Sequence, residues 1–181
     1  MATMVIKWFE KEFSKTPEDA RNSIHPAGGW WYTGDILNYL NKYSVHNATI
    51  ELEDAKSLTD ELEKGNIIIL CLDMYFVRNA ANDQWHIDKF YKTLNSEWGH
   101  FILLKGYKLV YNQLFFEVYD SNSLGAVYND NSLKGKERYY RFSDLDKATN
   151  LWWDYAIIVS KEKFKTSHGV DTEKIKHKYG K

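Results

Sequence analysis

Apolar residues recur along the chain with helical spacing in several stretches. A stripe of residues three and four apart runs from Met1 to Phe9, and similar spacing recurs at Ile36–Leu40 and before Gly65 at Leu58–Lys64. A capping box with proline at the first helical position, Thr16–Asp19, predicts a short helix between the first two. Gly65 is a residue type that commonly ends a helix. The first 65 residues are therefore predicted to be mostly helical.

Later in the chain the spacing changes to short, continuous apolar runs that favour buried strands. These runs are 66–72, 98–107, 114–120, 137–142 and 153–159, and a short helix is predicted to begin at Ser143. Residues 73–97 interrupt the strands. Ile87, Phe90, Tyr91 and Leu94 keep helical spacing there, which predicts one more helix in a connecting segment. The pattern as a whole predicts an α+β fold.

The runs 98–107 and 114–120 are matched in character and flank a loop predicted at 108–112, which indicates an antiparallel hairpin. If Tyr107 pairs with Gln113, antiparallel counting places His100 opposite Asp120. Directly opposed residues have Cβ atoms roughly 5 Å apart. A two-residue turn at Asn112–Gln113 would instead place His100 opposite Gly125, and the pair would be lost.

A carboxylate at that reach accepts a hydrogen bond from one ring nitrogen of a histidine and leaves the other to move a proton. His100 with Asp120 is therefore the best candidate for chemistry, as general base and orienting residue. Asn122 is the alternative orienting residue, because it lies in the turn directly after Asp120. The plain interpretation is a histidine that caps a strand end beside an unrelated turn aspartate.

Several motifs together resemble the papain-like bacteriocin-processing (double-glycine) cysteine peptidases. They are a histidine at the head of an apolar strand followed by Gly106–Tyr107, and a second strand ending in Val118-Tyr119-Asp120-Ser121-Asn122. A glycine followed by an apolar strand at 65–70, and a closing strand at 153–159, stand in the order that this family shows. The similarity extends over most of the chain.

The resemblance implies a papain-like fold with N-terminal helices packed on a twisted antiparallel sheet, and thiol acyl transfer, usually peptide-bond hydrolysis. In the family, the first core helix carries the nucleophilic cysteine at its start, with an oxyanion glutamine just upstream. Met1–Phe9 resembles the later turns of that helix, so both residues would precede Met1. We therefore expect a cysteine-peptidase-like domain that is inactive as this chain, either a fragment of an enzyme or a member that has lost catalysis.

Cys71 is the only cysteine, and we do not expect it to be the nucleophile. It lies within the apolar run 67–72, where a cysteine behaves as a small hydrophobic residue. Activation of a thiol requires a helix N-terminus or an adjacent cation, and a buried strand offers neither.

Tryptophans supply the second hypothesis, a non-catalytic module that binds a peptide or a glycan. Trp98 stands two residues before His100, and Trp30 and Trp31 follow a glycine-containing loop. Aromatic rings of this kind supply rigid contact area in binding clefts, although they equally serve in core and rim packing. Trp98, Trp30 and Trp31 are the candidate substrate-binding residues, and the expected partner is a peptide or protein substrate.

Composition narrows these hypotheses only slightly. The length of 181 residues predicts one domain, 1–160, followed by a lysine-rich tail, 161–181. A net charge of −1 gives no reason to expect nucleic acid as a partner, and no apolar run is long enough to span a membrane. The six histidines show no metal-ligand spacing, and no nucleotide-binding glycine motif occurs, so no metal or cofactor is expected. Compartment, oligomeric state and substrate identity do not follow from the sequence.

Overall fold

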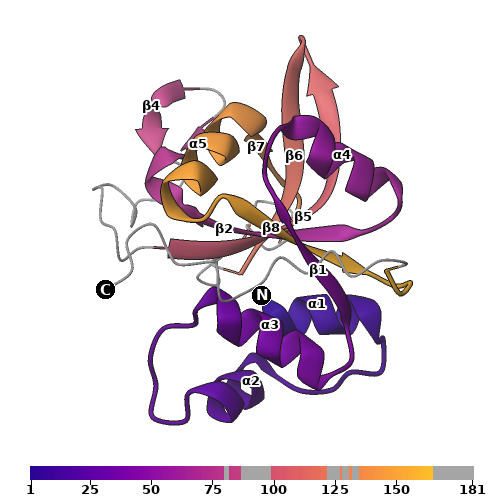
Figure 1. Ribbon diagram of the computed structural model, residues 1–181. Coiled ribbons are helices and arrows are strands. Elements are labelled where there is room, and N and C mark those ends of the chain that lie inside the picture. Colours follow the sequence, from indigo (N-terminus) through magenta and orange to yellow (C-terminus); the bar gives the residue numbers. More distant parts are fainter. Residues whose placement is uncertain (80–81, 87–98, 122–126, 128–130, 132–134, 165–181) are drawn as a thin grey trace.

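A computed structural model describes residues 1–79, 82–86, 99–121, 127, 131 and 135–164 of the chain (Figure 1). Across these ranges the fold is mixed, with five α-helices and a six-stranded antiparallel sheet. The helices are α1 Ala2–Phe9, α2 Pro17–Ile24, α3 Thr33–Lys42, α4 Ala55–Glu63 and α5 Phe142–Trp152. The strands are β1 His46–Glu51, β2 Ile67–Asp73, β3 Arg78–Asn79, β4 Asn82–His86, β5 Gly99–Val110, β6 Gln113–Asp120, β7 Arg138–Arg141 and β8 Tyr155–Ser160.

The predicted helices form where their caps stand in the sequence. The Thr16 hydroxyl accepts from the Asp19 amide at 3.1 Å, and the Asp19 carboxylate accepts from the Thr16 amide at 2.8 Å. Helix α4 begins earlier than predicted because Asp54 accepts a hydrogen bond from the Ser57 amide at 2.9 Å. It ends before Gly65, which has a φ of 80°.

The large sheet has the strand order β1-β8-β2-β5-β6-β7, and helices cover both of its faces (Figure 1). Helices α4 and α5 pack over one face, and α1, α2 and α3 pack over the other. Each face of the sheet has its own hydrophobic core, called here the α4–α5 core and the α1–α3 core after the helices that cover it. Alternate residues of β2 contribute to the two cores: Leu70 lies in the α4–α5 core, and Ile69 and Cys71 lie in the α1–α3 core. The expected packing of the N-terminal helices on an antiparallel sheet is confirmed at this level.

The hairpin of β5 and β6 has a different register from the predicted one. Val110 pairs with Gln113 across a two-residue turn, Tyr111 and Asn112, with φ values of 48° and 62°. Positive φ at both central residues is the geometry that matches the twist of paired strands. Residues 108–110 therefore belong to β5 instead of a loop. Asp120 stands opposite Ile102, and the predicted direct opposition to His100 is wrong.

A β-bulge in β5 shifts the register between Gly106 and Leu104, on the side of the strand away from the turn. Leu104 pairs with Val118 and Gly106 with Glu117, so Lys105 is the extra residue. Counting from the turn without this bulge would place Asp120 opposite Leu103 instead of Ile102. Because side chains alternate along a strand, the bulge decides which face of the sheet Asp120 occupies.

The rest of the described fold differs from the pattern in two places. Strand β1 was not predicted; its sequence, His46–Glu51, mixes polar residues with one isoleucine because β1 is an edge strand. Strands β3 and β4 form a small separate sheet in the segment after β2. The helix predicted around Ile87–Leu94 and the tail beyond Phe164 lie outside the described residues.

Candidate active site at one end of the sheet

His100 and Asp120 are hydrogen-bonded side chains, as the resemblance to a catalytic pair requires. His100 Nε2 lies 2.6 Å from Asp120 Oδ1. The side chain of Asp120 is 1% exposed and that of His100 is 15% exposed. An ionised carboxylate has no proton to give, so Nε2 is the donor of this bond. The contact is thus a buried, charge-assisted hydrogen bond.

The pair forms although the predicted register was wrong, because the error was an even number of residues. Asp120 stands opposite Ile102, two residues from His100 along β5, so His100 and Asp120 are diagonal neighbours on the same face. His100 is itself paired with Leu72 of β2, which lies in the α4–α5 core. By alternation, both side chains belong to the face that α4 and α5 cover.

The second carboxylate oxygen of Asp120 faces two side chains of β7. Arg138 Nη1 lies 3.5 Å from Asp120 Oδ2, and the Tyr140 hydroxyl lies 3.4 Å from the same oxygen. Arg138 Nη1 also donates to the Tyr140 hydroxyl at 3.2 Å. Sequence reasoning missed both residues, although their spacing of two within a predicted strand places them on one face.

The amide of Asp120 is also bound, to the carbonyl oxygen of Gly135 at 2.7 Å. Residues from β5, β7 and the segment before β7 therefore converge on this one aspartate of β6.

The start of α1 lies within electrostatic reach of this aspartate. Burial lowers the pKa of the Met1 amino group from its usual value, and the negative charge of Asp120 acts in the opposite direction. The body of α1 packs through Ala2, Val5 and Ile6 against the opposite face of the sheet from the one that His100 shares. The helix thus brings its first residue, and not its side, toward this end of the sheet.

Cys71 is placed as the sequence predicted, in the interior. It is 3% exposed and belongs to the α1–α3 core. Its neighbours on β2, Leu70 and Leu72, face the other core. Alternation therefore directs the thiol to the face opposite His100.

Two of the three candidate binding tryptophans lie in the described residues, next to each other in the loop between α2 and α3. Trp30 is 74% exposed in the loop between α2 and α3. Trp31 is partly buried, and its ring centroid lies 5.5 Å from that of Tyr39 in an edge-to-face contact. Trp98 and Asn122 lie outside the described residues.

A second histidine–aspartate pair, which the sequence reasoning did not identify, closes this loop. His25 Nε2 lies 3.0 Å from Asp35 Oδ2, and the same oxygen accepts from the Tyr32 amide at 2.7 Å. Asp35 therefore caps the start of α3 while it holds His25 at the end of α2. These contacts give the pair a structural role, because they join the two ends of the loop 25–32.

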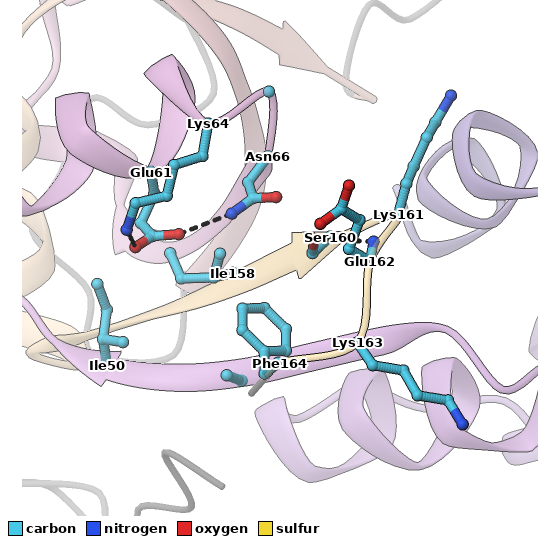
Figure 2. A pocket seen from close by; sticks show the side chains of 12 residues that line it. Ile50, Glu61, Lys64, Asn66, Ile158, Ser160, Lys161, Glu162, Lys163 and Phe164 are labelled. Carbon is cyan, nitrogen blue, oxygen red and sulfur yellow. Dashed lines mark hydrogen bonds and ion pairs between the residues drawn. The ribbon is translucent and has the colours of Figure 1, made fainter. Parts of the chain in front are cut away.

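A pocket of about 620 Å³ lies away from His100, at the other end of β2 (Figure 2). Apolar side chains of β1 and β8, including Ile50 and Ile158, form its floor beside Phe164. On its rim, Glu61 accepts from Lys64 at 2.6 Å and from Asn66 at 2.7 Å. The carboxylate of Glu61 is thus already hydrogen-bonded to residues at the end of its own helix. The pocket is separate from the candidate active site.

No group of three or more histidine, cysteine or acidic side chains gathers among the described residues as a metal site would need. No helix in the described part is long and apolar enough to cross a membrane. Comparison of the chain with protein-family models and with curated protein sequences gives no match.

Proposed function

We propose that this chain is a cysteine-peptidase-like domain in which His100 is the general base and Asp120 orients it. The observation that carries the proposal is the 2.6 Å hydrogen bond between His100 Nε2 and a carboxylate that is 1% exposed. The order of motifs, which resembles the papain-like bacteriocin-processing peptidases, supports a papain-like arrangement of the helices and the sheet. The reaction class is thiol acyl transfer, usually peptide-bond hydrolysis.

In this proposal the two ring nitrogens have different tasks. Nε2 donates to Asp120, which fixes the orientation of the ring and stabilises the imidazolium when it forms. Nδ1 is then the nitrogen that accepts the proton of a thiol. The resulting thiolate attacks the substrate carbonyl carbon, and the imidazolium returns its proton to the leaving amine.

The residues present do not supply the thiol. Cys71 points into the core on the other face of the sheet. A cysteine at the start of α1 would lie at a helix N-terminus, where the positive end of the dipole favours a thiolate. The reach of the Asp120 charge to the Met1 amino group supports this position. Residues 1–181 alone are therefore expected to show no thiol-dependent peptidase activity.

A thiol placed at position 1 tests the proposal. The variant Met1→Cys, expressed behind an added initiator methionine, is titrated with iodoacetamide between pH 5.5 and 8.5. The expected result is a thiol at least ~10-fold more reactive at pH 6.5 than Tyr111→Cys, a control on a side chain that is 97% exposed. Adding His100→Gln should remove the advantage, and Cys71 should label slowly in every protein.

Equal reactivity with and without His100 would overturn the assignment of His100 as base. The DNA upstream of the Met1 codon provides an independent test. An in-frame cysteine preceded by a glutamine favours an enzyme, and a stop codon followed by a ribosome-binding site favours a non-catalytic domain.

The second candidate, a peptide- or glycan-binding module, has one specific observation in its favour. Trp30 is 74% exposed and Tyr32 is 60% exposed on the loop that the His25–Asp35 contact holds. Rigid exposed aromatic rings are typical of binding surfaces. A change of tryptophan fluorescence on titration with peptides or oligosaccharides, absent in Trp30→Ala, would favour this function; no response to either ligand class would count against it.

A further inference from the structure

The two oxygens of Asp120 have different kinds of partner. Oδ1 takes the hydrogen bond of His100, whereas Oδ2 faces Arg138 and Tyr140. The side chains of His100 and Arg138 are each 15% exposed, and Tyr140 is 1% exposed. One buried anion is thus placed between two cationic residue types.

These two residue types differ in the pH range over which they are charged. An imidazole loses its proton near neutral pH, whereas a guanidinium stays protonated at every pH at which proteins fold. A buried carboxylate without a counter-charge is strongly unfavourable. If His100 were the sole counter-ion, Asp120 would lose its partner charge each time the ring gave up a proton. A proton-transferring histidine needs an orienting group that remains ionised in both states.

We propose that Arg138 is the permanent counter-ion of Asp120, and that Tyr140 is the positioning residue that holds Arg138 against it. Asp120 then accepts from Nε2–H of His100 whether or not Nδ1 carries a proton. The inference deepens the proposed function, and its catalytic purpose rests on that function. The charge balance around Asp120 does not depend on any reaction. The competing interpretation is a static pair in which a charged His100 neutralises Asp120.

Tyr140 is suited to this role because it remains a neutral hydroxyl. Burial and the adjacent Asp120 charge raise the pKa of Tyr140 well above its ordinary value. The hydroxyl accepts from Arg138 at 3.2 Å and has one proton to share with Asp120 at 3.4 Å. Arg138 and Tyr140 are adjacent on one face of β7, so a single strand supplies both groups.

Within the described ranges, two further elements place titratable groups near this network. The Met1 amino group at the start of α1 interacts with the Asp120 charge, and burial lowers its pKa. Asp73 ends β2 and pairs with Gly99 beside His100, and burial raises its pKa. Both groups are present in wild type and in every variant below, and Arg138→Lys, which keeps a cation at position 138, controls for their response to the lost charge.

The experiment measures the unfolding equilibrium constant of the whole chain between pH 6 and pH 8.5. Arg138→Gln removes the permanent counter-charge of Asp120, so the charge state of His100 contributes more to balancing Asp120 than it does in wild type. A group whose pKa is raised by folding contributes stability below its unfolded pKa and loses it as the pH rises through the folded pKa. The unfolding constant of Arg138→Gln relative to wild type should therefore rise at least ~10-fold from pH 6 to pH 8.

Arg138→Lys retains a cation and is the matched control, with a ratio to wild type that stays flat over this range. A purely structural role for Arg138 would lower stability equally at every pH. A ratio for Arg138→Gln that does not change with pH therefore overturns the proposal. Tyr140→Phe should show a weaker form of the same pH dependence, because Arg138 loses its support but keeps its charge.

A second measurement needs no variant and decides the question if Arg138→Gln does not fold. Nitrogen-15 spectra of wild-type protein, recorded with rising pH until the ring is neutral, should show the proton of His100 on Nε2, and carbon-13 spectra of the same samples should show Asp120 ionised. A neutral ring with its proton on Nδ1, or a protonated Asp120 carboxyl, would overturn the inference. Neither result depends on thiol reactivity at position 1, so the inference and the proposed function can fail separately.

Discussion

At the scale of single residues, two buried acids in the described part of the chain, Asp120 and Asp73, differ in the partners that stabilise their charge. Asp120 is held by His100, Arg138 and Tyr140 together. Asp73, at the end of β2, is 3% exposed and accepts a hydrogen bond from the Tyr75 amide at 2.9 Å. Burial raises the pKa of Asp73, and the amide bond offsets this only in part.

Asp73 should therefore lower the stability of the fold at neutral pH. Its folded pKa lies above its unfolded value of about 3.9, so its favourable contribution is present below that pH and is lost as the pH rises. Asp73→Asn keeps an oxygen acceptor for Tyr75. We expect it to raise the unfolding free energy at pH 7 by on the order of 1 kcal/mol and to have no effect near pH 4.

Urea titrations at both pH values provide the measurement. Asp19→Asn is the control with the opposite sign, because hydrogen bonds from Thr16 lower the pKa of Asp19. That variant should be less stable than wild type at pH 7, with the difference shrinking as the pH falls. Asp73→Asn that destabilises at pH 7 would show that the charge of Asp73 has a partner the burial argument does not include.

At the scale of elements, the bulge at Lys105 accommodates one extra residue in β5 and so keeps His100 and Asp120 on the same face of the sheet. The turn at Tyr111 and Asn112 alone would place Asp120 on the face opposite to His100. The extra residue in β5 restores the common face. Lys105 itself is exposed, and its amine lies 5.2 Å from the centre of the Tyr119 ring.

Deletion of Lys105 should be tolerated although it shortens a strand in the interior of the sheet. The pairs on either side, Leu104 with Val118 and Gly106 with Glu117, become consecutive pairs of a regular ladder. We expect an unfolding free energy within about 1 kcal/mol of wild type and an intact His100–Asp120 hydrogen bond. Denaturant titration and the histidine nitrogen-15 spectrum check both.

Deletion of Lys108, which is also an exposed lysine of β5, is the matched control. It moves Tyr107 away from the face of Phe116, where its ring packs and its hydroxyl donates to Glu63. That variant should be markedly less stable. If the two deletions lowered the unfolding free energy equally, the bulge would be no more tolerant of a deletion than the regular part of β5.

At the scale of the whole molecule, the two cores share the strands between them. Leu58 of α4 and Leu40 of α3 are fully buried on opposite faces of the sheet. Strand β2 contributes alternate residues to both cores. Loss of either core therefore removes the support of the other, and one cooperative unfolding transition is expected.

Labelling of Cys71 measures this coupling. Leu58→Ala and Leu40→Ala should each cost roughly 2–5 kcal/mol. Both should accelerate Cys71 alkylation by the factor that corresponds to the loss of unfolding free energy, although only Leu40 shares a core with Cys71. A Leu58→Ala protein that unfolds more readily by circular dichroism but labels Cys71 at the wild-type rate would indicate independent halves.

The sequence by itself determined most of the helices and the central strands, because their signals are local. The Thr16 capping box, the Gly65 terminator and the apolar run of β2 each depend on residues only a few positions apart. The burial of Cys71 followed from the same run. The His100–Asp120 contact was predicted from a register in error by two residues, and it survived because an even shift keeps side chains on their face.

Only the tertiary structure decided what surrounds that contact. The bulge at Lys105 reflects the fit of β5 between two partner strands, which local propensity does not encode. Arg138 and Tyr140 reach Asp120 because β7 pairs with β6 over a long sequence separation. The edge strand β1 carries too little apolar pattern to be recognised before its pairing with β8 is known. Strand pairing between distant segments is thus the physical reason that the site could be located from sequence but not completed.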